Sequence, residues 1–600
     1  MSEQLPKRSD VPVELTWNLA DLYQSMEDFD ADKQKVETLI QQFVMHYKDH
    51  LTDAEDIVAA IADYEEILTI MTRMDQYSFL PVSVDITDTE IVKFMRQMTA
   101  FNAQQAATLS FFPSQVQQLS TDILDEVLAK YPEHIALIRM MKKEKASALS
   151  PQLEEALKKM NPVFDGYYDM YEQITSADAD FGTFEANGKE YPLSFVLYEE
   201  YYMYHEDTAV RRAAYKKFNE VLAQYQNTLA SAYYHHVLKE KAEATMRGFD
   251  SVFDFLLQGQ EVDQELYHRQ IDRLMKDFAP VMRKYITHIK EERGLDAMHY
   301  ADLKIDLDPE YTPSITIEEA ANMVEASVAT LGTDYVQKIM PAFEERWVDF
   351  ARNIGKRSGA FCSGAYDVHP YIMMSWSGLQ SDAYTLIHEL GHAGQGILSA
   401  ENQTLLSSRP SLYLIEAPST FHELLLSDHL RTVADSPRAE RSVISKMISK
   451  TYFHNFVTHL LEAAYQREVY RLIDKGDSFG ANKLNEIKHQ VLSDFWGDAV
   501  ELEPGSELTW MRQPHYYMGL YPYTYSAGLT IATQAYLKLK SGEMDAEQWL
   551  NFLKLGGTKE PIAAAKVAGV DIATDEALKQ TIAYLDRSVD RIIALTNEMK

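Results

Sequence analysis

The sequence predicts a mainly α-helical protein with one β-hairpin and a small β-sheet beside a helix that carries two histidines. Three observations support this fold class. Apolar residues recur every three or four positions along most of the chain, and only two segments alternate in the manner of strands. The sequence has no fixed repeat period, so it does not predict a solenoid. The 600 residues are 46% hydrophobic and 25% charged, which is typical of an ordinary globular protein.

The segment 53–74 shows the helical periodicity clearly, because its apolar residues share one face: Ile57, Ala60, Ile61, Tyr64, Ile67 and Leu68. The same rhythm predicts helices within 86–110, 120–145, 151–176, 206–245, 261–293, 316–351, 437–475, 544–556 and 575–598. We divide the chain near residue 200 into an N-terminal helical domain, 1–200, and a larger C-terminal domain, 201–600.

Two segments predict β-structure. The segment 180–195 alternates apolar and polar residues around Asn187–Gly188, a pair that strongly indicates a hairpin turn. The segment 356–376 is rich in glycine and aromatic residues, and it predicts two or three short strands that lead into the histidine-bearing helix. The small sheet is therefore expected beside that helix.

The charge balance and the cysteine count restrict the possible partners and location. The formal charge is −34, from 57 Lys and Arg against 91 Asp and Glu, which opposes binding to nucleic acid or to an anionic membrane. The single cysteine, Cys362, excludes an internal disulfide framework, and we expect it to be a small buried residue. The first residues do not resemble a secretory signal, and no apolar run is long enough to span a bilayer. We therefore expect a cytoplasmic protein.

The stretch "HELGH", residues 388–392, is the strongest chemical signal in the sequence. On a helix, His388 and His392 share one face, where two imidazoles can reach one Zn²⁺, while Glu389 can act as a general base. In a chain of this length and composition, the expected number of chance matches to such a motif is about 0.1. Asp382 can cap the start of the helix. A glycine at position 391 is costly inside a helix, which indicates a close approach to its backbone.

A catalytic zinc ion needs a third protein ligand and an open position. The segment 412–430 predicts a second helix, in which Pro418 is tolerated only in the first turn or at a kink, so that Glu416 is expected near the helix start. The candidates for the third ligand are Glu416, Glu423, His422 and His429. The two histidines can equally be surface residues with satisfied hydrogen bonds, and spacing alone leaves both glutamates open.

"TLIHELGHAGQ" followed by "IEAPSTFHELL" resembles the M3 family of zinc metallopeptidases, in particular its oligoendopeptidase F branch. The resemblance extends to "FEANGKEYPLSF", to "RSGAFCSGAYDVHPYIMMSWSG" and to "FLKLGGTKEPIAAAKVAGVDI", and so covers most of the chain. It implies that Glu416 is the third zinc ligand, that Glu423 supports a histidine ligand, and that residues 201–600 form the catalytic domain. It further implies a large multi-helix metallopeptidase with a deep channel between two helical halves.

The tyrosine-rich stretch 512–529 alone would indicate a packed aromatic layer. In the family that the chain resembles, a histidine followed by tyrosines stabilises the tetrahedral intermediate. By position this implies His515, Tyr521 and Tyr525 as catalytic residues, with Tyr523 as an alternative. The chain has Gly528 where a related oligopeptidase has a further tyrosine.

We therefore predict an endopeptidase that cleaves internal bonds of short peptides, with one Zn²⁺ per chain. A metallocarboxypeptidase is an alternative, for which Arg409 or Arg512 would hold the free carboxylate of the substrate. A non-catalytic protein that binds peptides and zinc is another, although structural zinc sites usually have four ligands, often cysteines. The sequence does not determine the oligomeric state, and it contains no phosphate-binding motif.

Overall fold

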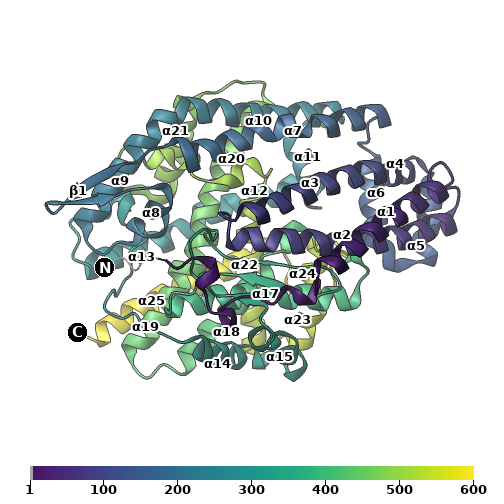
Figure 1. Ribbon diagram of the computed structural model, residues 1–600. Coiled ribbons are helices and arrows are strands. Elements are labelled where there is room, and N and C mark those ends of the chain that lie inside the picture. Colours follow the sequence, from purple (N-terminus) through teal and green to yellow (C-terminus); the bar gives the residue numbers. More distant parts are fainter. Residues whose placement is uncertain (1–4) are drawn as a thin grey trace. The chain divides into compact units, whose positions relative to one another are not determined.

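The computed structural model describes residues 5–600 and confirms the mainly helical fold (Figure 1). The chain forms two compact units, each assembled from three separate stretches. Unit 1 comprises residues up to 148, 313–429 and 535–570, and unit 2 comprises residues 149–312, 430–534 and 571–600. Stretches of the two units alternate along the sequence, so the units do not correspond to two consecutive domains. The domain boundary near residue 200 stays a prediction.

Unit 1 contains the N-terminal helices and the helix with the HELGH motif. Its α-helices are α1 (Met26–Tyr47), α2 (Ala54–Val84), α3 (Thr89–Leu109), α4 (Phe111–Gln118), α5 (Thr121–Lys130), α6 (Ile135–Lys145), α14 (Ile317–Val328), α15 (Thr333–Ile339), α16 (Pro341–Glu344), α17 (Gln380–Asn402), most of α18 (Ala417–Thr432), the end of α22 (Tyr523–Ser541), α23 (Ala546–Leu553) and α24 (Pro561–Val567). Its strands are β3 (Val348–Asp349), β4 (Phe361–Ser363) and β5 (Tyr371–Met373).

Unit 2 contains the remaining helices and the hairpin. Its α-helices are α7 (Pro151–Gln173), α8 (Phe195–Glu200), α9 (Thr208–Leu222), α10 (Gln226–Met246), α11 (Val252–Gln258), α12 (Gln264–Arg273), α13 (Ala279–Glu292), α19 (Pro437–Lys446), α20 (His459–Asp474), α21 (Ala481–Trp496), most of α22, and α25 (Glu576–Glu598). Its strands are β1 (Thr183–Ala186) and β2 (Lys189–Pro192). Three of its segments have π-helical geometry: η5 (Ile174–Asp178), η8 (Leu274–Phe278) and η13 (Met447–Thr458).

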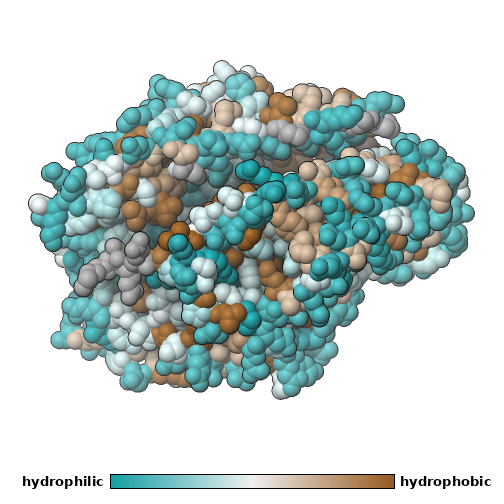
Figure 2. Space-filling model, viewed as in Figure 1, coloured by the Kyte–Doolittle hydropathy of each residue, from teal (hydrophilic) through white to brown (hydrophobic). Residues whose placement is uncertain are grey.

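Burial of the apolar helix faces stabilises each unit. In unit 1, residues such as Ile57, Ile61 and Phe112 are fully buried between α1, α2 and α4, and they belong to the same cluster as Tyr371 and Met373 of β5. This cluster ties the N-terminal helices to the sheet beside α17 through the removal of apolar surface from water. Hydrophilic residues occupy much of the face seen in Figure 2, with smaller hydrophobic patches among them.

Both predicted regions of β-structure are confirmed. Strands β1 and β2 pair in antiparallel register across Asn187 and Gly188, which have φ values of 51° and 71°, as a tight hairpin turn requires. In the second sheet the strand order is β3-β5-β4, with β4 antiparallel and β3 parallel to β5. Among the described strands, β4 pairs with β5 alone and is therefore an edge strand, and Cys362 lies half-buried within it.

Some predicted helices have different bounds in the structure. Helix α2 continues ten residues beyond the predicted 53–74, because Leu80, Val82 and Val84 are also buried in unit 1. The predicted helix 316–351 is interrupted at Gly332, whose φ of 96° cannot continue a helix, and it ends before β3. Across residues 5–600, no helix is long and apolar enough to cross a membrane.

Candidate metal centre and active site

Helix α17 presents the two motif histidines on one face. His388 and His392 are one turn apart, and their ring centroids lie 5.0 Å from each other. The start of the helix is held by Asp382 from within the first turn. Its carboxylate accepts hydrogen bonds from the backbone N–H groups of Ser377 at 2.6 Å and Gly378 at 2.9 Å. Asp382 therefore stabilises the helix start as expected, although it lies after the N-cap position.

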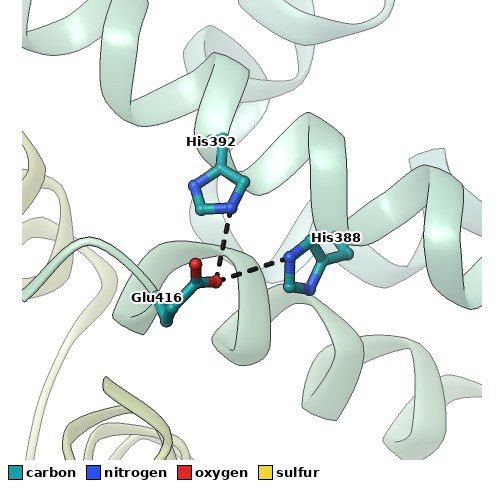
Figure 3. Close-up of side chains that lie close together, drawn as sticks. All are labelled: His388, His392 and Glu416. Atoms are coloured by element: carbon teal, nitrogen blue, oxygen red, sulfur yellow. Dashed lines mark ion pairs between the residues drawn. The ribbon is translucent and has the colours of Figure 1, made fainter. Parts of the chain in front are cut away.

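Glu416 approaches the same place from the start of α18. Its backbone oxygen accepts a hydrogen bond from the N–H of Thr420, and Pro418 lies in the first turn, as predicted. Its Oε2 lies 3.5 Å from Nε2 of His388 and 3.4 Å from Nε2 of His392. Both rings point towards this one oxygen (Figure 3). The structure thus brings together the three residues named as ligands from the sequence and the resemblance.

The spacing of these donor atoms fits a zinc ion. Ligands at 2.0–2.1 Å from a tetrahedral centre lie about 3.4 Å from one another, close to the distances of 3.5 and 3.4 Å from Oε2 of Glu416 to the two imidazoles. Two imidazole nitrogens and one carboxylate oxygen form a donor set typical of catalytic zinc with one open position. The His388 side chain is 24% exposed and that of His392 is 19% exposed, so the site is accessible from one side.

Gly391 allows the two ligand-bearing helices to approach each other. A Cβ atom at this position would lie 2.6 Å from both the carbonyl oxygen of Pro418 and the Cα of Ser419. Real side chains do not tolerate such distances to backbone atoms. The glycine predicted to permit a close approach therefore does so, and the approaching group is the first turn of α18. Ser419 also donates a hydrogen bond of 2.9 Å from Oγ to Oε2 of Glu416.

Two further residues of α18 lie near the ligands, and one of them contacts His388. Nδ1 of His388 lies 2.7 Å from Oε1 of Glu423, so this carboxylate orients the ring from the side away from Glu416. His422 is buried, with Nε2 only 2.9 Å from the hydroxyl of Tyr335. Burial, with a smaller contribution from the nearby imidazoles of the two ligands, lowers the pKa of His422 to about 3. His422 is therefore a neutral structural residue, and His429 is half-buried farther along the helix.

Glu389 is in a suitable environment for a general base. It is 6% exposed, and burial raises its pKa. The positive charges of His388 and His392 oppose this shift, while the carboxylates of Glu416 and Glu423 add to it. A raised carboxyl pKa brings the base closer to the operating pH, where general bases are most effective.

Unit 2 brings together His515, Tyr521 and Tyr525. The hydroxyl of Tyr525 lies 3.5 Å from Nε2 of His515, and the two tyrosine ring centroids are 5.1 Å apart. Tyr523 points elsewhere, because it is buried and its hydroxyl donates a hydrogen bond of 2.5 Å to Gln260. The alternative that Tyr523 is the catalytic tyrosine is thereby disfavoured.

The sequence reasoning did not find two buried residues beside His515. His459 and Glu462 lie three positions apart at the start of α20, and they form a cluster with His515 whose nitrogen and carboxylate atoms lie within 4.8 Å of one another. The available signal was the H-x-x-E spacing on a predicted helix, which places both side chains on one face. This signal was weak, because His515 lies 53 positions after Glu462 in the chain.

The cations considered for a carboxypeptidase do not form a recognition site within either unit. The guanidinium group of Arg512 is paired with Glu199 at 2.6 Å, and its side chain is only 5% exposed. Its charge is therefore already compensated. Arg409 is exposed. Neither residue presents a buried free charge for the terminal carboxylate of a substrate.

The chain is similar in sequence to known peptidases over most of its length. Residues 201–584 match the sequence model of peptidase family M3. The chain is 25% identical to oligopeptidase PepF of Bacillus subtilis, covering 100% of this chain and 90% of the relative. It is 26% identical to an oligoendopeptidase F homolog of Borreliella burgdorferi, covering 94% and 95%.

Solved structures show the same fold. The crystal structure of oligoendopeptidase F from Enterococcus faecium matches with a TM-score of 0.73 at 20% identity, covering 95% of this chain and 99% of that chain. The crystal structure of a putative peptidase from Chlamydophila abortus matches with a TM-score of 0.85 at 22% identity, covering 99% of this chain and 100% of that chain. The family match extends over more than half of the chain and includes all three residues of the candidate metal site. The chain therefore belongs to peptidase family M3, and it is a metalloendopeptidase.

Proposed function

We propose that His388, His392 and Glu416 hold one Zn²⁺, at which internal bonds of short peptides are hydrolysed. The observation that carries this proposal is the convergence of two Nε2 atoms on Oε2 of Glu416 at 3.5 and 3.4 Å. A zinc ion bound there would polarise the scissile carbonyl group and lower the pKa of water. The neighbouring hydrogen bond from His388 to Glu423 would keep Nε2 directed at the metal.

Glu389 is the general base in this proposal. It follows His388 directly and therefore lies around the helix from the ligand face, where it can take a proton from the attacking water and return it to the leaving amine. Its burial and raised pKa support both steps, because a raised pKa makes the carboxylate a better proton acceptor.

His515, Tyr521 and Tyr525 are proposed to donate hydrogen bonds to the oxyanion of the tetrahedral intermediate. Their grouping within unit 2 supports a shared role. The distance of 3.5 Å between Tyr525 and His515 is long for a hydrogen bond, as is common for catalytic groups without substrate.

The substrate is proposed to bind in an extended conformation along the edge strand β4. Backbone hydrogen bonding of this type tolerates many side chains, in keeping with degradation of varied short peptides. We also expect that folded proteins are excluded as substrates. The acidic composition is expected to oppose binding to nucleic acid or membranes. A cytoplasmic location is proposed, consistent with the single cysteine.

The Glu389→Gln variant tests the central proposal. It should retain one zinc ion per chain, because the ligands are unchanged, while peptide hydrolysis falls by about 10²–10⁴-fold. Zinc content by elemental analysis and cleavage of an internally quenched peptide give the two readouts. Glu401→Gln, at an exposed residue of the same helix, is the matched control. Wild-type turnover in the Glu389→Gln variant, or turnover that resists a chelator, would exclude the proposal.

A further inference from the structure

We propose that Glu462 is a positioning residue that supports both His515 and Tyr525, the first directly and the second through His459. This inference rests on the proposed function, because it concerns groups assigned there to the oxyanion. All the residues involved lie in unit 2, where α20 supplies His459 and Glu462 and the segment 514–525 supplies the other two.

Glu462 contacts both imidazoles through one oxygen. Its Oε2 lies 2.8 Å from Nδ1 of His459 and 3.5 Å from Nδ1 of His515. The carboxylate is almost completely buried, with a side-chain exposure of 3%. Burial raises the pKa of Glu462, yet the two imidazoles together lower it well below its usual range. Glu462 is therefore an ionised acceptor, and the Nδ1 atom of His459 carries the proton of their hydrogen bond.

His459 transmits this support to Tyr525. The two rings are stacked, with centroids 3.8 Å apart and an angle of 10° between their planes. The hydroxyl of Tyr525 then lies beside Nε2 of His515 at 3.5 Å. Loss of the carboxylate would therefore release both proposed oxyanion donors together.

The local backbone explains how His459 is held. The π-helical segment η13 ends at Thr458, immediately before His459. Residues five apart form hydrogen-bonded turns in a π-helix, whereas in an α-helix they point in different directions. His454 therefore approaches His459, with their Nε2 atoms 3.1 Å apart. Because Nδ1 of His459 is a donor, its Nε2 is the acceptor of the hydrogen bond from His454.

A metal ion is a less suitable occupant of this cluster than a hydrogen-bonded network. The 2.8 Å contact between His459 and Glu462 is a hydrogen-bond distance, shorter than the separation of about 3.4 Å between ligands on a tetrahedral ion. Lys488 and Lys304 also interact electrostatically with the carboxylate of Glu462. Burial, the larger effect, lowers the pKa of Lys488 to about 8. Burial likewise lowers the pKa of Lys304 to about 7, and the positive charge that these two lysines retain disfavours an additional dication.

The test compares Glu462→Gln with Glu462→Asp in the full-length zinc enzyme. We expect Glu462→Gln to lower kcat about 10–100-fold, as for other residues that orient a catalytic group, and to change KM by less than about threefold. Glu462→Asp keeps the charge and should restore part of kcat. The affinity for a phosphinic peptide that mimics the tetrahedral intermediate should fall by the same factor as kcat/KM.

Glu240→Gln is the matched control, because Glu240 is also a buried carboxylate of unit 2 that contacts a tyrosine and a histidine. It should leave kcat and inhibitor affinity near the wild-type values. If Glu462→Gln does not fold, as judged by its thermal unfolding, His459→Phe takes its place. This variant retains a ring against Tyr525 but loses the Nδ1 donor, and a fall in kcat with unchanged KM is again expected.

The inference is overturned if folded Glu462→Gln retains wild-type kcat and inhibitor affinity, or if its effect is confined to KM. It is also overturned if the wild type binds two zinc ions and Glu462→Gln binds one. These results differ from failure of the proposed function, in which the wild type would resist a chelator or Glu389→Gln would remain active.

Discussion

His388 lies between two carboxylates, with Nδ1 at 2.7 Å from Oε1 of Glu423 and Nε2 at 3.5 Å from Oε2 of Glu416. In the neutral ring, the hydrogen bond to Glu423 places the proton on Nδ1, so that Nε2 has its lone pair for a metal ion. Burial lowers the pKa of His388, but Glu423 and the nearby Glu389 and Glu416 raise it to about 10. The site therefore strongly favours a positive charge, which a metal ion would supply.

Removal of the Glu423 carboxylate should weaken metal binding without removing a ligand. We expect zinc affinity to fall about 10-fold in Glu423→Gln, where the amide oxygen can still accept the hydrogen bond, and up to about 100-fold in Glu423→Ala. Competition with a chromophoric chelator measures this affinity. Glu401→Gln, on the exposed part of α17, provides the comparison. Equal zinc affinity in all variants would show that Glu423 does not orient His388.

Gly391→Ala should destabilise the protein although alanine is the better helix former. The propensity gain is about 1 kcal/mol, whereas a Cβ 2.6 Å from two backbone atoms of α18 forces the helices apart, at a cost of about 1–3 kcal/mol. Because α18 begins beside Glu416, zinc affinity should fall as well. Urea unfolding and zinc competition provide the two measurements.

Gly396→Ala is the matched substitution on the same helix. A Cβ there would meet only Pro370 Cγ, at 3.9 Å, so we expect unchanged or slightly higher stability. Equal stabilisation by both alanines would contradict the close contact between α17 and α18.

Tyr525→Phe and Tyr523→Phe should separate a catalytic phenol from a structural one. Loss of the Tyr525 hydroxyl should lower kcat about 10²–10³-fold, the usual effect of losing one oxyanion donor. Tyr523→Phe removes the hydrogen bond to Gln260 and should cost about 1 kcal/mol of stability with little change in kcat. Steady-state kinetics and urea unfolding of both variants check this, and the reverse ranking of kcat would make Tyr523 the catalytic residue.

His422 should make the stability fall in acid. Its pKa is 6.5 in the unfolded chain and about 3 in the fold, chiefly because of burial, so between these values the unfolded state binds more protons. The free energy of unfolding therefore decreases as the pH falls through this window, by up to about 1.4 kcal/mol per unit. His422→Asn should show a shallower slope in urea unfolding with excess chelator.

Tyr335→Phe controls for the loss of the hydrogen bond, since it removes the partner hydroxyl and leaves the imidazole in place. Its slope should match that of the wild type. A slope in His422→Asn equal to that of the wild type would show that His422 is not held neutral by the fold.

Some features of this protein follow from the sequence because they depend on neighbouring residues. The HELGH stretch places its two histidines on one face of any helix, and Asn187–Gly188 favours a hairpin turn without help from the rest of the chain. Helical periodicity likewise identified most helices. It did not give the end of α2, because burial against other helices decided which residues continued it.

The site depended on contacts between residues far apart in the chain. Spacing left Glu416 and Glu423 equally open as the third ligand, and only the packing of α18 against Gly391 brings Glu416 to both Nε2 atoms. The tyrosine-rich stretch could not reveal which phenol is buried among core residues. The cluster of His459, Glu462 and His515 joins two segments through side-chain packing. Tertiary structure decides distances of this kind. Periodicity determines the direction in which a side chain points from its own helix, but it does not determine which residue of another helix lies beside that side chain.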